Sequence, residues 1–186
     1  MNTPRLVAIV LLFAPVTVTA QFSSLQFGVA AGATFPSGDL STAGYGMGWQ
    51  GMTFVAFRIR HSPVAFRLHG SYGSNTSSEP SNGVPTERRD KLLGGDADLT
   101  LTFPGPARHN FYLLVGPGLY RASDTVTQYG VTSSGSEPTK FGYNLGAGFT
   151  IGALFFETRY VHVDGFGDSS SRIFNTITAG LRLGGW

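Results

Sequence analysis

Residues 140–150 read Lys-Phe-Gly-Tyr-Asn-Leu-Gly-Ala-Gly-Phe-Thr, and this stretch decides the fold. Every second position is apolar, while the positions between carry glycine, asparagine or threonine. A period of two produces a β-strand with one apolar face and one polar face. The stretch therefore predicts a strand that separates an apolar environment from a polar one.

The same alternation recurs along most of the chain and predicts an all-β fold of eight strands. We expect these strands at 23–35, 46–60, 64–73, 89–103, 108–121, 139–150, 153–163 and 172–184. Short connections at 61–63, 104–106 and 151–152 alternate with long polar ones at 36–45, 74–88, 122–138 and 164–171. This pattern is typical of an antiparallel up-and-down transmembrane β-barrel with short periplasmic turns, long external loops and both termini on the periplasmic side.

The first twenty residues have the features of a secretory signal peptide. Arg5 supplies a positive charge, an apolar run covers 6–13, and small residues precede a cleavage site after Ala20. The apolar run is shorter than the roughly 20 residues that a membrane helix needs. We therefore expect a cleaved signal peptide at 1–20 and one outer-membrane barrel domain at 21–186.

Charged residues decide which face of the barrel meets lipid. The polar positions carry most of the charges, whereas the apolar positions carry charge only near strand ends, at Arg89, Lys91 and Arg121. An arginine or lysine that faced the middle of a bilayer would cost roughly 2–4 kcal/mol. The pattern therefore favours a lipid-facing exterior over a soluble, lipocalin-like barrel, which would carry its apolar residues inside.

Aromatic residues on the apolar face are expected to form two girdles at the membrane interfaces. The external girdle is predicted to contain Tyr45, Trp49, Tyr72, Tyr143 and Tyr160, and the periplasmic girdle Phe57, Phe103, Phe111, Phe149 and Trp186.

The polar face predicts a network of charges inside the barrel. Its members are Arg58, Arg67, His69, Asp96, Asp98, Glu157, Arg159 and Arg182. The interior of an eight-stranded barrel is just wide enough for its own side chains. We expect Arg67 and His69 to lie near Asp96 and Asp98, and Arg159 near Glu157, because an unpaired buried charge is costly. The network is either a permanent structural plug or the gate of a narrow channel.

Composition limits the chemistry. The chain has no cysteine, a net charge of +2, 26 glycines and only 13% charged residues. It shows no metal-ligand spacing and no phosphate-binding loop, so we expect no catalytic residues, no cofactor, no metal and no nucleic-acid partner. His162 lies near Asp164 at the external edge, but its surroundings do not match a lipid A deacylase. Pro117 interrupts the predicted strand at 108–121 and leads us to expect a local bulge, which leaves the facing of Tyr120 open.

The chain resembles the small porin-like barrels of the outer-membrane β-barrel family, the relatives of OmpA and OmpX. The resemblance rests on residues 25–32, 111–120, 140–148 and 156–160. It implies insertion by the barrel-assembly machinery with periplasmic chaperones, and no catalytic residues. The family usually ends in an aromatic residue in register with the last strand, whereas Trp186 has the opposite parity to Leu183.

Three functions follow as hypotheses. The first is a non-enzymatic outer-membrane barrel that contributes to envelope integrity or to surface interaction through its external loops. The second is a narrow porin-like channel gated by interior charges, and the third is a lipid A-modifying enzyme that uses His162. The expected partners are outer-membrane lipid and lipopolysaccharide, and the barrel is expected to be a monomer.

Overall fold

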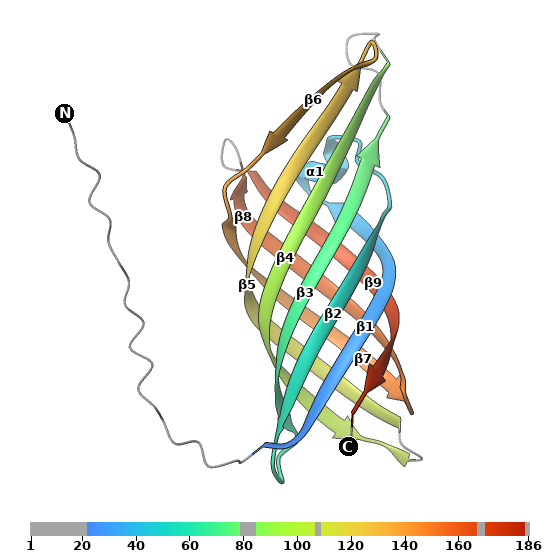
Figure 1. The fold of residues 1–186 in the computed structure, drawn as a ribbon, viewed down its shortest axis with the longest axis vertical. Helices are drawn as coiled ribbons and strands as arrows, with labels where there is room; N and C mark the ends of the chain where they lie inside the picture. The colour runs from blue at the N-terminus through green and yellow to red at the C-terminus, as the bar shows by residue number, and fades with distance from the viewer. Residues whose placement is uncertain (1–21, 79–84, 107–108, 167–169, 185–186) are drawn as a thin grey trace, which may run out of the picture.

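The computed structural model describes residues 22–78, 85–106, 109–166 and 170–184. The described chain forms nine strands and one short helix (Figure 1). Their bounds are β1 Phe22–Ser37, α1 Asp39–Thr42, β2 Gly48–Ile59, β3 Val64–Ser77, β4 Thr86–Pro104, β5 His109–Gln128, β6 Val131–Ser136, β7 Lys140–Ile151, β8 Leu154–Phe166 and β9 Ser170–Leu183.

Eight of the strands close into an antiparallel ring. The order is β4-β3-β2-β1-β9-β8-β7-β5, and β4 also pairs with β5, which joins the two ends of the sheet. β1 begins and β9 ends at the same end of the barrel, and Figure 1 shows the short turns at that end. The structure confirms the predicted eight-stranded up-and-down barrel, while the signal peptide and the boundary after residue 20 lie outside the described residues and stay predictions.

The external side differs from the predicted loops. We expected irregular loops at 74–88 and 122–138, but β3 continues to Ser77, β4 begins at Thr86, and β5 continues to Gln128. β6 then folds back and pairs with the upper part of β5. A strand needs about 9–11 residues to cross a membrane, whereas β4 has 19 and β5 has 20. A β-sheet of β3, β4, β5 and β6 therefore rises above the rest of the barrel (Figure 1).

Pro117 does not produce the predicted bulge. The register of β5 with β7 is continuous through Pro117, which stands opposite Tyr143. The register with β4 is the same above and below Pro117, although Ala97 and Asp98 form no ladder pair there. Because the proline has no N–H group, β5 does not pair with β4 at this point. The registers of β5 with β4 and with β7 are unchanged. Tyr120 consequently points inward and is only 1% exposed.

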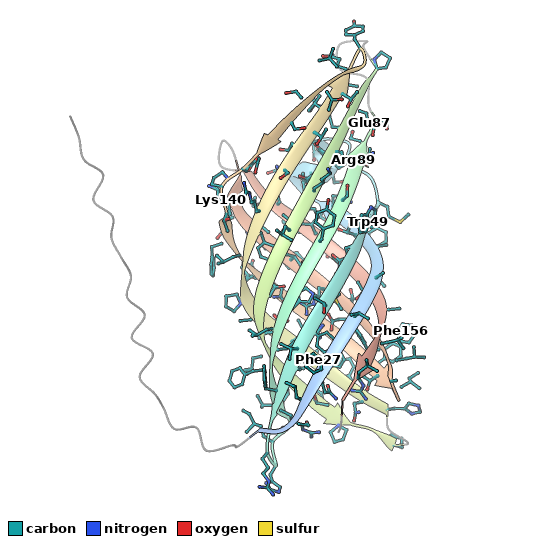
Figure 2. The ribbon with its side chains drawn as sticks, in the orientation of Figure 1. Phe27, Trp49, Glu87, Arg89, Lys140 and Phe156 are labelled. Atoms are coloured by element: carbon teal, nitrogen blue, oxygen red, sulfur yellow. The ribbon has the colours of Figure 1, made fainter. Side chains whose placement is uncertain are left out.

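The outer face of the barrel is an apolar belt with aromatic residues near both edges. Trp49, Tyr72 and Tyr143 are exposed near the external edge, and the ring centroids of Trp49 and Tyr72 lie 5.7 Å apart. Figure 2 shows Trp49 on the upper part of the barrel, with Phe27 and Phe156 pointing outward lower down. The arrangement is that of a surface exposed to hydrocarbon. At the periplasmic edge the side chains of Phe103, Phe111 and Phe149 are exposed, while that of Phe57 is half-buried. On the external half, Tyr160 is also half-buried.

Tyr45 was wrongly predicted to belong to the external girdle. It precedes β2 and packs against a buried cluster at the external mouth, built around Leu40, Tyr120 and Phe174. Leu40 belongs to α1, so this helix brings an apolar side chain to the mouth of the barrel. Trp186, which was assigned to the periplasmic girdle, lies outside the described residues. None of the helices in the described ranges is long and apolar enough to cross a membrane.

Candidate functional site

A buried ion network crosses the middle of the barrel, and Glu157 on β8 is at its centre. The carboxylate accepts hydrogen bonds from both terminal nitrogens of Arg67 on β3, at 2.5 and 3.3 Å. It also accepts the hydroxyl of Tyr112 at 2.7 Å and Nε of Arg159 at 2.6 Å. The Glu157 side chain has no exposed surface. Its charge is therefore balanced entirely by two arginines and one hydroxyl donor.

Arg159 joins Glu157 to the carboxylates on β4. Nη2 donates to Asp98 at 2.9 Å, and Nη1 lies 3.4 Å from Asp96 and from the amide oxygen of Asn144. Asn144 itself donates to Asp98 at 2.8 Å. The planar guanidinium suits this task because it carries five donors in a fixed fork. One arginine thus binds three carboxylates from two strands that are not neighbours.

His69 and Tyr120 complete the network on its external side. Nδ1 of His69 lies 2.6 Å from Asp96, and Nε2 faces the sulfur of Met52 at 3.2 Å. The hydroxyl of Tyr120 donates to the other oxygen of Asp96. With His69 neutral, the network contains two arginines and three carboxylates, so it carries one excess negative charge.

The structure brings six of the eight predicted interior residues into this network: Arg67, His69, Asp96, Asp98, Glu157 and Arg159. Arg67 stands opposite Asp98 in the β3–β4 register, yet its guanidinium reaches across the barrel to Glu157. Arg58 and Arg182 lie further toward the periplasmic end, and Arg182 lines the same interior space as Arg67 and Tyr112. They lie near the periplasmic turns, where Arg58 donates to the carbonyl of Ser62 and Arg182 to that of Gly152.

Sequence reasoning did not identify Tyr112, Tyr120 and Asn144 as members of the network. A signal for the tyrosines was present, because both lie on the glycine-rich inward face of β5. A Cβ atom added to Gly148 on β7 would come within 2.4 Å of the Tyr112 ring, and one added to Gly94 on β4 within 2.7 Å of the Tyr120 ring. Glycine on the neighbouring strand therefore makes room for a large inward side chain.

Two small cavities lie on opposite sides of the network. The periplasmic one has a volume of about 40 Å³ and is lined by Phe54, Arg67 and Tyr112 among others. The external one has a volume of about 30 Å³ and is lined by His69, Asp96 and Arg159 among others. A water molecule needs roughly 10–15 Å³ of such space. Each cavity can hold a few water molecules, and the ion network separates them.

A second ion cluster lies near the external mouth, above the apolar belt. Arg172 on β9 donates to Asp90 on β4, and its other terminal nitrogen lies 3.3 Å from Asp124 and 3.1 Å from Glu137. Burial raises the pKa of Asp90 to about 7, and the nearby carboxylate of Asp124 adds to this effect while Arg172 opposes it. Burial also raises the pKa of Tyr45, which lies close to the same acids.

Other candidate chemistry is sparse in the described part of the chain. No cluster of three or more histidine, cysteine or acidic side chains there could hold a metal ion. His162 stacks on Tyr143 with ring centroids 5.0 Å apart, and its Nε2 lies 3.0 Å from Asp164. Its Nδ1 is buried and has no hydrogen-bond partner among the described residues. Among the described side chains, the geometry therefore supplies a His–Asp pair without a hydroxyl nucleophile bonded to it.

Comparison with known proteins identifies the fold. No family model matches the chain, and no curated protein does. Among solved structures, Neisserial surface protein A is 18% identical over 86% of this chain and 96% of its own, with a TM-score of 0.58. Ail, the attachment invasion locus protein of Yersinia pestis, is 15% identical over 86% and 98%, with a TM-score of 0.53. The chain therefore has the fold of small outer-membrane β-barrels, and its apolar belt agrees with that location.

Proposed function

We propose that the protein is a closed, non-enzymatic outer-membrane barrel that acts through its external surface. The observation that carries the proposal is the buried network around Glu157 and Arg159. Each of the five ionised side chains, on three strands, has at most 4% of its surface exposed. The cavities on its two sides hold only a few water molecules. A resting barrel built in this way offers no continuous water path.

The external sheet supplies the surface for such a role. β5 and β6 form a hairpin whose tip is the two-residue turn Tyr129–Gly130, with φ of 51° and 77°. Positive φ at both central residues is the type I′ geometry that suits a right-handed twisted hairpin. The turn presents Tyr129, which is 79% exposed, beside Val131 at 72%. An exposed aromatic side chain at the tip of a hairpin is well suited to contact with another molecule.

The names of two barrels of similar fold support a role at the cell surface. One barrel of similar fold is named as a surface protein, and another as an attachment and invasion protein. The second has also been solved in complex with a heparin analogue. We propose that this chain likewise interacts at the cell surface, as a monomer in contact with outer-membrane lipid and lipopolysaccharide, after insertion by the barrel-assembly machinery and periplasmic chaperones.

The test uses the full-length chain expressed in a Gram-negative host. Outer-membrane protein that migrates differently on SDS gels before and after boiling would establish a closed, stable barrel. The same protein, reconstituted in planar lipid bilayers, should give no steady single-channel conductance. A steady conductance in wild-type protein would contradict the proposed closed state.

A gated narrow channel is the second candidate, and the two cavities favour it, since the ion network lies between them. If the channel hypothesis holds, replacing Arg159 with alanine should open a conductance that wild-type protein shows only transiently. If the network is a permanent plug, the wild-type protein should show no brief openings. The Arg159→Ala variant should then lose stability. An enzymatic role for His162 would require a lipid-modifying activity that His162→Ala abolishes.

A further inference from the structure

The basic residues on the lipid-facing side of β4 and β5 have no place in the interior network. On β4 the outward positions carry Arg89, Lys91 and then Leu93, and on β5 Arg121 is outward because its neighbours Tyr120 and Ala122 are buried. Lys91 stands opposite Ser123, and Arg121 stands opposite Leu93. Lys91 and Arg121 are thus diagonal neighbours, within reach of one another for side chains of this length.

The surroundings of Lys91 and Arg121 contain hydroxyl groups instead of carboxylates. Among the described residues neither side chain forms an ion pair. Nε of Arg121 donates to the hydroxyl of Ser136 on β6 at 3.0 Å, which orients the guanidinium. Ser74 on β3 and Ser123 on β5 stand opposite Lys91 in the two ladders. Two positive charges and a set of hydroxyl groups therefore share one outward patch.

Arg89, the third outward basic residue, is already partnered. It forms an ion pair with Glu87 at 3.1 Å, and both side chains are about half exposed. Figure 2 shows both residues above Trp49, further from the belt. Arg89 is therefore outside the patch of Lys91 and Arg121.

The patch lies at the height of the lipid headgroups. Leu93, two residues below Lys91, is 57% exposed and begins the apolar belt beside Tyr72. Trp49 stands in the same cross-strand row as Lys91, with Ser74 between them. Tryptophan and tyrosine mark the level of the headgroups in membrane proteins. Lys91 and Arg121 therefore meet the phosphate layer and not the hydrocarbon.

We propose that Lys91 and Arg121 form a binding site for the phosphate group of an outer-leaflet lipid. An arginine fork can hold two phosphate oxygens, and a lysine adds a point charge, so the pair is matched to a phosphate monoester. The acyl chains of such a lipid would lie along Leu93 and Tyr72 of the belt. The inference rests on the proposed membrane-spanning barrel and names one lipid chemistry that it contacts.

The test exploits the position of Trp49. Strands lie about 4.8 Å apart, so Trp49 on β2 is roughly 10 Å from Lys91 on β4. All proteins would carry Trp186→Phe, which leaves Trp49 as the sole tryptophan, and would be folded in an uncharged maltoside detergent. Phosphatidic acid with brominated acyl chains is then titrated while quenching of Trp49 is recorded, with brominated phosphatidylcholine of the same chains as reference.

Lys91→Gln/Arg121→Gln should bind phosphatidic acid about 25-fold more weakly, since each basic residue near a charged lipid surface contributes about fivefold. The control Arg60→Gln/Arg88→Gln removes the same charge from the periplasmic end of β2 and from the opposite parity of β4, and should bind as the parent does. The charge-preserving Lys91→Arg/Arg121→Lys should retain most of the affinity. Excess inorganic phosphate should not displace the lipid.

Three outcomes would overturn the site. They are equal affinity of the two Gln double variants, equal quenching by the two brominated lipids, and displacement by inorganic phosphate. The boiling shift of each variant on SDS gels is measured in parallel. If the Lys91→Gln/Arg121→Gln variant has a normal boiling shift and unchanged lipid binding, the phosphate site alone is refuted. If the parent protein shows no boiling shift, the proposed barrel is refuted.

Discussion

Replacing Glu157 with glutamine tests whether the interior network stabilises the barrel. The change preserves the shape of the side chain and removes one charge. Arg67 then loses the carboxylate that binds it twice, and retains mainly the ring of Phe54, 3.7 Å from its guanidinium carbon. Arg159 keeps Asp96 and Asp98. The predicted cost therefore comes mostly from one buried arginine.

Removal of one partner from a buried ion pair typically costs about 3–5 kcal/mol. We expect Glu157→Gln to lower the free energy of unfolding by an amount in this range. The loss should be partly restored by adding Arg67→Met, because a matched pair of uncharged side chains leaves no charge unpaired. The coupling between the two changes is then read from a double-mutant cycle.

The measurement is urea unfolding of barrels folded in lipid vesicles, followed by tryptophan fluorescence and by the boiling shift on gels. Glu87→Gln is the matched control, since its ion pair with Arg89 is half exposed and should contribute less than about 1 kcal/mol. A loss for Glu157→Gln no larger than that of the control would refute the view that the network supports the fold.

Three further changes test other parts of the molecule by the same unfolding assay. Gly148→Ala should cost about 1–3 kcal/mol because its Cβ would lie 2.4 Å from the Tyr112 ring, whereas Gly135→Ala, with no atom within 4 Å, should cost almost nothing; equal losses would contradict the packing argument. Leu145→Arg places a charge midway along the lipid face of β7 and should cost about 2–4 kcal/mol; an unchanged midpoint would argue against lipid contact there. Asp90 has a raised pKa, so folding favours its neutral form, and its contribution to stability falls as the pH rises from about 4 to about 7. The difference in the free energy of unfolding between wild type and Asp90→Asn should therefore change across this pH range, and a constant difference would contradict the raised pKa.

The sequence predicted the ring of strands and its two faces because both follow from a period of two. Side chains at alternate positions must point to opposite faces of a sheet, so Leu145 and Asn144 are separated whatever the register. The expected proximity of His69 to Asp96 also holds, since the two residues stand opposite one another on β3 and β4. These features are local, and local pattern determines them.

The contacts inside the barrel were harder to predict because they cross it. Arg67 lies opposite Asp98 on the neighbouring strand, yet a long side chain in a narrow interior can reach the far wall and bind Glu157. Which partner it takes depends on the room left by the glycines and tyrosines around it, and strand order alone does not give that room. The same reason explains why Tyr112 and Tyr120 were not identified.

The external sheet was missed for a different reason. Residues 122–138 are rich in serine, threonine and glycine, a composition that usually marks loops. The tip of the hairpin is Tyr129–Gly130, which lacks the Asn-Gly or Asp-Gly pair that usually signals a type I′ turn. Pairing of β5 with β6, beyond the point where β7 leaves β5, organises these polar residues into strands.

The geometry of a small barrel links its closed interior to its external surface. Eight strands leave a lumen just wide enough for side chains to fill, and here Glu157, Arg159 and two tyrosines occupy its middle. Filling it with ionised groups requires them to be paired, which fixes their positions and leaves little space for a ligand. The belt must remain apolar to match the bilayer, so variation there is also restricted. The strands above the belt are free of both requirements, and β4 and β5 extend furthest in that region. Selection for a specific role can therefore act most readily on the external sheet and on the headgroup-level patch of Lys91 and Arg121.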